Sequence, residues 1–168
     1  MSVAKPAETE RLSRVDPAPR GGVMGLLLGL VPYVIIAIVT WAAYANSLEA
    51  DFIFDDMHNI VNNKSLHMTE LSPAQLWDAA TGNATPRPVA YVSFALNYLV
   101  HELDVTGYHV VNTIIHMLAG FAVYALALHL LPMLMGVKRP LGRGEAVVLA
   151  LGVALIFVAH PVQTQSVT

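Results

Sequence analysis

Two adjacent carboxylates, Asp55 and Asp56, are the residues of this sequence best suited to acid–base chemistry. They follow the apolar residues Phe52, Ile53 and Phe54, which we expect to anchor the segment at a membrane surface. A carboxylate placed there could act as a general base or bind a metal ion. Because neighbouring side chains of an extended segment point to opposite sides, one carboxylate could face a site while the other caps or pairs. On composition alone, two solvated loop acids are the favoured alternative.

A second group of polar residues follows helical spacing. His109, Asn112, Thr113 and His116 stand at positions i, i+3, i+4 and i+7 of an apolar run, and Gly120 continues the same face. Polar groups within a bilayer must face protein or water, so this face is predicted to point into a helix bundle. A metal ion shared by the two histidines is disfavoured, because their Cα atoms would lie ~10.5 Å apart along the axis. Helix packing through interhelical hydrogen bonds is favoured instead.

Three further histidines lie outside these two groups of residues. His160 precedes Pro161, which ends or kinks the third apolar run, so we expect His160 to be exposed on the same membrane side as the acid pair. His58 and His67 have no partner at metal-ligand spacing, and both are expected to be solvated. No metal site is predicted from these residues.

The composition identifies the class of protein that must position these residues. The chain has 168 residues, 55% of them hydrophobic and 12% charged, with a net charge of −3. Ordinary soluble domains carry roughly 25% charged residues, and disorder requires high charge with low hydrophobicity. Cysteine is absent, which excludes disulfides, thiol nucleophiles and Cys-ligated metals. Without a basic surplus, nucleic acid is not an expected partner. The class of protein that fits this composition is therefore an integral membrane protein.

The distribution of apolar residues predicts an all-α integral membrane fold with three transmembrane helices, each long enough for a bilayer. An amphipathic helix over 88–103 is too short to span, and we expect it at the membrane interface, with packing against the helix bundle as the alternative. Its predicted apolar face comprises Val89, Val92, Leu96, Leu99, Val100 and Leu103, with Ser93, Asn97 and His101 on the wet side. The predicted segments are a disordered cytoplasmic leader (1–22), spans (23–45, 107–131, 145–160), an extracytoplasmic loop (46–106), a cytoplasmic basic connector (132–144) and the start of a second extracytoplasmic segment (161–168).

The basic residues predict the orientation. Seven of the nine lysines and arginines precede the first span or follow the second, whereas the long loop holds only Lys64 and Arg87. By the positive-inside rule, the N-terminus is cytoplasmic and the acidic loop is extracytoplasmic. We expect the bacterial inner (cytoplasmic) membrane as the location, with membrane lipid and other transmembrane helices or subunits as partners.

Several blocks together resemble the transmembrane-and-tetratricopeptide-repeat protein O-mannosyltransferases and their bacterial relatives, within the GT-C glycosyltransferase superfamily. They are YANSLEADFIFDD (44–56), RPVAYVSFALNYLV (87–100), GYHVVNTIIHML (107–118) and AHPVQTQSV (159–167). The blocks keep the order, spacing and predicted membrane side of the N-terminal part of that family.

The resemblance implies a polyprenyl-phosphate sugar as donor and a Ser/Thr hydroxyl of an acceptor protein as nucleophile. By matching position, Asp55 would be the general base and Asp56 its support or a ligand of a divalent metal. Arg87, with Lys64 second, would meet the charge of the leaving phosphate. His160 would line the site.

Two departures bear on activity. Gln163 and Gln165 stand where the family has a His and a Glu, and amides cannot act as acid or base. The family also has further spans, so we expect this chain alone not to be catalytic. The alternative function is an accessory subunit that packs its polar face and Gly120 against a respiratory or photosynthetic membrane complex. An ion or proton pathway is weaker, because the apolar central parts of the spans lack Asp, Glu, Lys and Arg.

Overall fold

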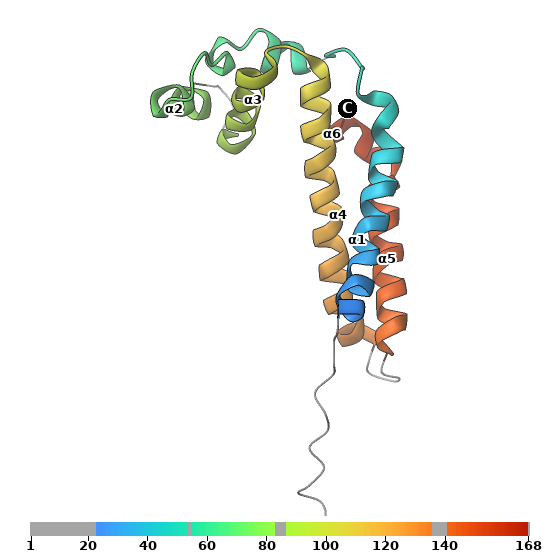
Figure 1. Cartoon of the computed structure of the whole chain (residues 1–168). Helices are drawn as coiled ribbons and strands as arrows, with labels where there is room; N and C mark the ends of the chain where they lie inside the picture. The colour runs from blue at the N-terminus through green and yellow to red at the C-terminus, as the bar shows by residue number, and fades with distance from the viewer. Residues whose placement is uncertain (1–22, 54, 83–86, 136–140, 168) are drawn as a thin grey trace, which may run out of the picture. The chain divides into compact units, whose positions relative to one another are not determined.

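The computed structural model describes residues 23–53, 55–82, 87–135 and 141–167, and within these segments the chain is helical and contains no strand (Figure 1). The all-α prediction is therefore confirmed for the described residues. The chain divides into two compact units, Met1–Val31 and Pro32–Thr168. In the first unit, the described residues form the first turns of helix α1 (Val23–Tyr44), and the side chains of Leu27, Leu28 and Leu30 are exposed. The predicted leader, 1–22, lies outside the described residues.

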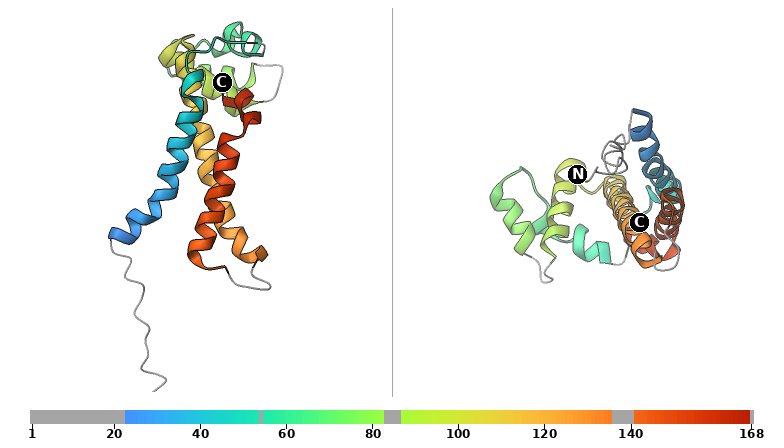
Figure 2. Two further views of the ribbon diagram at one scale, coloured as in Figure 1. Left: turned by 90° about the vertical axis from the view of Figure 1, so that its right-hand side faces the viewer. Right: turned by 90° about the horizontal axis from the view of Figure 1, so that it is seen from below.

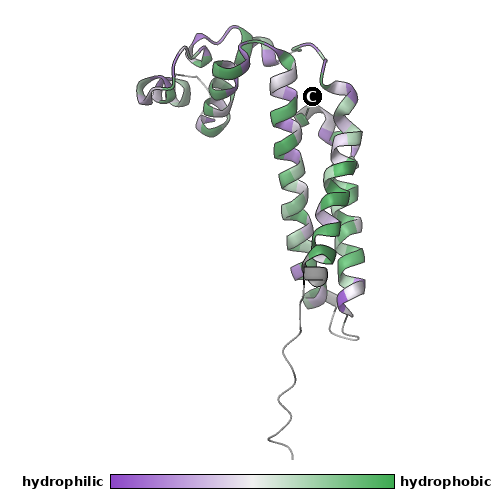
Figure 3. Cartoon of the chain, viewed as in Figure 1, coloured by the Kyte–Doolittle hydropathy of each residue, from purple (hydrophilic) through white to green (hydrophobic). Residues whose placement is uncertain are grey.

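Two helical stretches, Leu27–Ser47 and Val105–Leu134, are long and apolar enough to cross a membrane. The second belongs to helix α4 (Val105–Met135). The third predicted span corresponds to helix α5 (Arg143–Ala159), which has 17 residues and is shorter than the other two. Hydrophobic residues occur along the length of all three helices (Figure 3). The structure therefore supports two candidate spans, and the third stays a prediction.

Within the second unit, α4 and α5 run antiparallel and side by side, and residues 32–44 of α1 pack against them (Figures 1 and 2). The core between these three helices is apolar and includes one aromatic group. Tyr33 meets both Phe121 and Tyr124 edge to face, with ring centroids 5.3 and 5.2 Å apart. The buried members of this core are Ile36, Tyr124, Ala150, Ala154 and Val158.

Small residues explain how α5 approaches its neighbours. Its buried positions recur every four residues, which places them on one helical face: Ala146, Ala150, Ala154 and Val158. Without a strong hydrophobic force between helices in lipid, close packing of small side chains supplies the contact. The opposite positions, such as Val148 and Ile156, are exposed and apolar.

The end of α4 differs from the prediction. We assigned residues from 132 onward to the connector, but the helix continues through Pro132 to Met135. A proline loses one backbone hydrogen bond, a defect that a transmembrane helix tolerates. Residues 136–140 of the connector, including Lys138 and Arg139, lie outside the described residues.

The long loop is folded rather than a simple connection. Its helices α2 (Pro73–Thr81) and α3 (Pro88–His101) enclose a second small core with the turn that contains Leu66 and Met68. Ser72 caps α2 by accepting a hydrogen bond from the N–H of Gln75 at 3.3 Å. The remaining short helices are η1 (Ala45–Ser47), η2 (Met57–Val61), η3 (Lys64–Leu66), η4 (Pro161–Gln163) and α6 (Thr164–Val167).

Helix α3 buries one residue that we predicted on its wet side. Tyr91 and Ala95 enter the loop core, and Asn97, expected on the wet side, is 6% exposed. Val89 and Val100, on the predicted apolar face, are 83% and 72% exposed, so that part of the face is not covered by the described residues. The apolar periodicity identified a helix, but the side chains supplied by α2 and η3 decide which face is covered.

Candidate functional site

Asp55 and Asp56 begin a helical turn that continues into η2, so the extended geometry that we expected is wrong. Successive residues of a helix are about 100° apart, and the two carboxylates do not point to opposite sides. Asp56 Oδ2 accepts a hydrogen bond from the N–H of Ile53 at 3.3 Å. Asp55 is exposed, and its carboxylate forms no hydrogen bond or ion pair with any residue that the structure describes. One acid thus bonds to the backbone before the turn, while the other is accessible.

The predicted cations lie on elements next to this turn. Arg87 is exposed at the start of α3, and Lys64 is exposed at the start of η3. The hydroxyl of Tyr91 donates to Asn59 Oδ1 at 3.3 Å, which joins the first turn of α3 to η2. The Asn59–Tyr91 contact therefore brings the elements of the acid pair and of Arg87 together.

The two loop histidines differ in their surroundings. His58 is exposed. His67 is not solvated as we expected: its ring stacks on Tyr98 with centroids 4.3 Å apart and an interplanar angle of 6°, and its Nε2 is buried with no hydrogen-bond partner in the described segments. The loop core places Tyr98 against His67, which local sequence around His67 could not show.

The polar face of α4 lies inside the second unit. His109, Thr113 and His116 are buried, and Asn112 is half-buried. The hydroxyl of Thr113 donates to the carbonyl of His109 at 2.8 Å, a bond within its own helix. His109 Nε2 lies 2.8 Å from the carbonyl oxygen of Ala50, at the beginning of the loop.

His116 joins three helices. Its Nε2 lies 3.1 Å from the carbonyl oxygen of Val158 on α5, to which the Tyr44 hydroxyl of α1 also donates at 3.2 Å. The imidazole meets the Tyr44 ring edge to face, with centroids 5.3 Å apart, and contacts Phe157. Sequence reasoning missed Tyr44 and Val158, since nothing in the local pattern identifies a backbone carbonyl as a partner.

Gly120 marks a close approach of helices. A Cβ atom at this position would lie 2.5 Å from Val158 Cγ1 and 3.1 Å from Ile36 Cγ2. Gly120 and His116 are therefore covered by α1 and α5 of the same chain, whereas His109 meets the loop backbone at Ala50. The accessory-subunit alternative would need another surface for its partner.

His160 is exposed where α5 ends, and its Nδ1 accepts a hydrogen bond from the N–H of Val162 at 3.2 Å. It therefore caps η4, and no contact with the acid pair is found among the described residues. Gln163 is half-buried, and the side chain of Gln165 lies outside the described residues.

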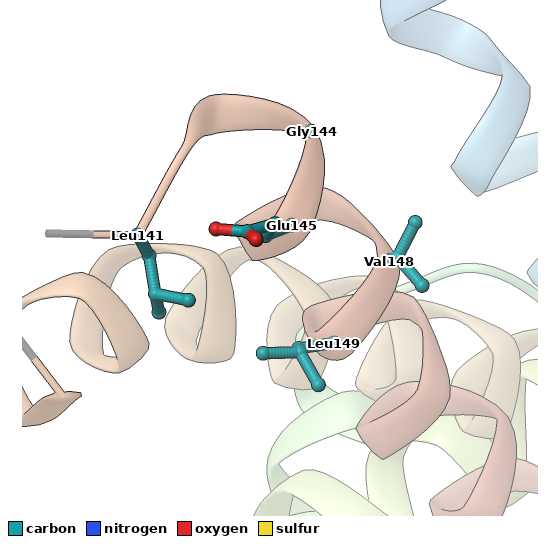
Figure 4. A pocket seen from close by; sticks show the side chains of 5 residues that line it. All are labelled: Leu141, Gly144, Glu145, Val148 and Leu149. Carbon is teal, nitrogen blue, oxygen red and sulfur yellow. The ribbon is translucent and has the colours of Figure 1, made fainter. Parts of the chain in front are cut away.

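A hollow of about 530 Å³ lies at the other end of α5, far along the helix from His160 (Figure 4). Four of its lining residues carry no charge, and Glu145 accepts a hydrogen bond from the N–H of Gly142 at 3.0 Å. None of the predicted site residues lines it: the lining comprises Leu141, Gly144, Glu145, Val148 and Leu149.

The described side chains do not fit a divalent metal. No group of three or more histidine or carboxylate residues in the described ranges is arranged to hold a metal ion. Asp55 and Asp56 therefore lack a third protein ligand there.

Comparison with known proteins gives relatives of one kind. The chain is 31% identical over 147 residues to "Protein O-mannosyl-transferase TMTC4" of Mus musculus, and 32% identical over 142 residues to "Protein O-mannosyl-transferase TMTC3" of the same species. It is 29% identical to "Protein O-mannosyl-transferase F38B6.6" of Caenorhabditis elegans. These matches cover 79%, 80% and 83% of this chain, respectively.

The matched relatives are much longer than this chain, which spans 19%, 14% and 20% of their respective lengths. No family model matches the sequence, and no solved structure does. The resemblance stated from the sequence blocks is confirmed by these relatives. Together with the apolar helices, they support a membrane location.

Proposed function

Since this chain is homologous to part of the TMTC protein O-mannosyltransferases, we propose that it is a membrane module of a protein O-glycosyltransferase that uses a lipid-linked sugar. The donor would be a polyprenyl-phosphate sugar, and the acceptor a protein. The observation that carries the proposal is the acid pair: Asp56 accepts a hydrogen bond from the N–H of Ile53, whereas the Asp55 carboxylate is exposed and without a partner among the described residues.

The proposed reaction uses Asp55 as the general base. A Ser or Thr hydroxyl of the acceptor transfers its proton to the Asp55 carboxylate as its oxygen forms a bond to the anomeric carbon of the sugar. The bond between that carbon and the phosphate oxygen breaks, and the polyprenyl phosphate leaves with the electron pair. The Asn59–Tyr91 contact supports Arg87 as the cation that meets this negative charge, with Lys64 as the second candidate.

The same proposal assigns a membrane arrangement. We take α5 as a third span. Its exposed residues are apolar and its buried face consists mainly of small residues, as in a packed transmembrane helix. The acidic loop would be extracytoplasmic, and the N-terminus cytoplasmic. Helix α3 would lie at the interface, because it lacks charged residues, leads into α4 and exposes a stripe containing Val89, Leu96 and Val100.

Substitution of the acids in the full-length protein tests the function. Membranes containing Asp55→Asn should transfer tritiated mannose from polyprenyl-phosphate mannose to protein about 10²-fold more slowly, the usual contribution of a general base. Asp56→Asn should cost less, because an amide oxygen can still accept from the N–H of Ile53. Glu70→Gln, which removes an exposed carboxylate of the same loop, is the matched control and should be unaffected. Undiminished transfer by Asp55→Asn would overturn the assignment.

A further inference from the structure

The beginning of the long loop is fastened to α4 by a buried hydrogen bond. His109 Nε2 lies 2.8 Å from the carbonyl oxygen of Ala50, across 59 residues of sequence. Because a carbonyl oxygen can only accept, Nε2 carries the proton and donates it. The His109 side chain is 4% exposed, so little water competes for this bond.

An aromatic contact holds the same segment two residues after Ala50. The Phe52 ring meets the Tyr108 ring edge to face, with centroids 5.3 Å apart and an interplanar angle of 79°. Tyr108 is itself fixed, because its hydroxyl donates to the carbonyl of Glu102 at 3.0 Å. Adjacent residues of α4 thus hold both Ala50 and Phe52.

The other imidazole nitrogen sharpens the role of His109. Its Nδ1 is buried and has no hydrogen-bond partner among the described residues. The bond to Ala50 is therefore the one that orients the ring, and its partner is loop backbone rather than another transmembrane helix. A histidine that served only helix packing would have no need of this donor.

We propose that His109 is a positioning residue for the acid pair, which it holds through the backbone of Ala50. Asp55 lies five residues after the clamped carbonyl and three residues after the clamped Phe52 ring. At ~3.3 Å per extended residue, release of the clamp would let the carboxylates move by several ångströms. Misplacement by 1 Å can cost about 10²-fold in rate. This inference rests on the proposed function of Asp55 but makes a separate structural claim.

Two amide variants of His109 test the proposal with matched polarity. In His109→Gln, the amide nitrogen can reach the position of the imidazole Nε2 and still donate to Ala50. In His109→Asn, the side chain is one methylene shorter and cannot reach. The natural chain has no cysteine, so an Asp51→Cys variant carries a single nitroxide beside the clamp. The label reports loop mobility by its electron paramagnetic resonance line shape, and Asp51 is exposed.

The full-length protein should respond to the two variants differently. We expect His109→Asn to increase label mobility and lower kcat for transfer from polyprenyl-phosphate mannose at least tenfold, with little change in KM for the donor. His109→Gln should keep both values within about twofold of the parent, because the clamp remains.

Two outcomes separate this proposal from the proposed function. If His109→Asn leaves the label immobile, or if the two His109 variants behave alike, the proposed role of His109 is overturned even when Asp55→Asn is inactive. If the label responds as expected and Asp55→Asn still transfers mannose, the clamp stands while Asp55 is not the base.

Discussion

His116 Nε2 donates to the carbonyl oxygen of Val158 across 3.1 Å, and this bond ties α4 to the last turn of α5. The last carbonyls of a helix have no partner within it. Pro161, two residues beyond the end of α5, lacks an N–H and cannot continue the hydrogen-bond pattern. The side chains of His116 and Tyr44, from two other helices, satisfy the Val158 carbonyl instead.

Replacement of His116 should show how much this hydrogen bond contributes to the free energy of unfolding. His116→Phe keeps a ring beside Tyr44 and Phe157 but removes the donor, so we expect a loss of about 1–2 kcal/mol in the free energy of unfolding. The apparent melting temperature in detergent should fall accordingly. His129→Phe is the control, because His129 is exposed on the same helix. Equal melting of both variants would show that the Tyr44 hydroxyl, which donates to the same carbonyl, satisfies it without His116.

Enlargement of Gly120 should destabilise the three-helix core. Its added Cβ would meet Val158 Cγ1 at 2.5 Å, a distance that requires the helices to shift. Overpacking of this kind costs about 1–3 kcal/mol, so Gly120→Ala should lower the melting temperature. At Gly152 on α5, an added Cβ meets nothing within 4 Å, and Gly152→Ala should melt at or above the temperature of the parent. The reverse order would contradict the close approach.

The exposed stripe of α3 should contact lipid. Single nitroxides at Val89→Cys and Val100→Cys, introduced into the cysteine-free chain, should be relaxed more by oxygen than by a polar nickel complex when the protein is in vesicles. Asn62→Cys is the control, because Asn62 is exposed and polar in the same loop. Preferential access of the nickel complex at Val89 and Val100 would place the stripe in water.

The orientation has its own test. A membrane-impermeant maleimide added to intact cells should label Glu70→Cys in the acidic loop, whereas Arg143→Cys at the start of α5 should react only after permeabilisation. Both positions are exposed, so accessibility within the protein is matched. The opposite labelling pattern would place the acid pair on the cytoplasmic side.

The sequence by itself determined the membrane class, the helical fold and the candidate acid pair. Long uncharged runs have few other structures available, because backbone groups in lipid must be satisfied within the segment. Helix α2 could also be predicted from the sequence, because Ser72 and Pro73 form a recognisable start to a helix. The same reasoning placed the polar face of α4 but could not name its partners.

Tertiary structure alone decided those partners. The carbonyls of Ala50 and Val158 receive His109 and His116, and a carbonyl carries no sequence signature because every residue has one. Likewise, the burial of Asn97 and the stacking of His67 depend on a loop core assembled from distant segments. Periodicity shows that a helix has two faces, but only the elements packed against it determine which face is buried.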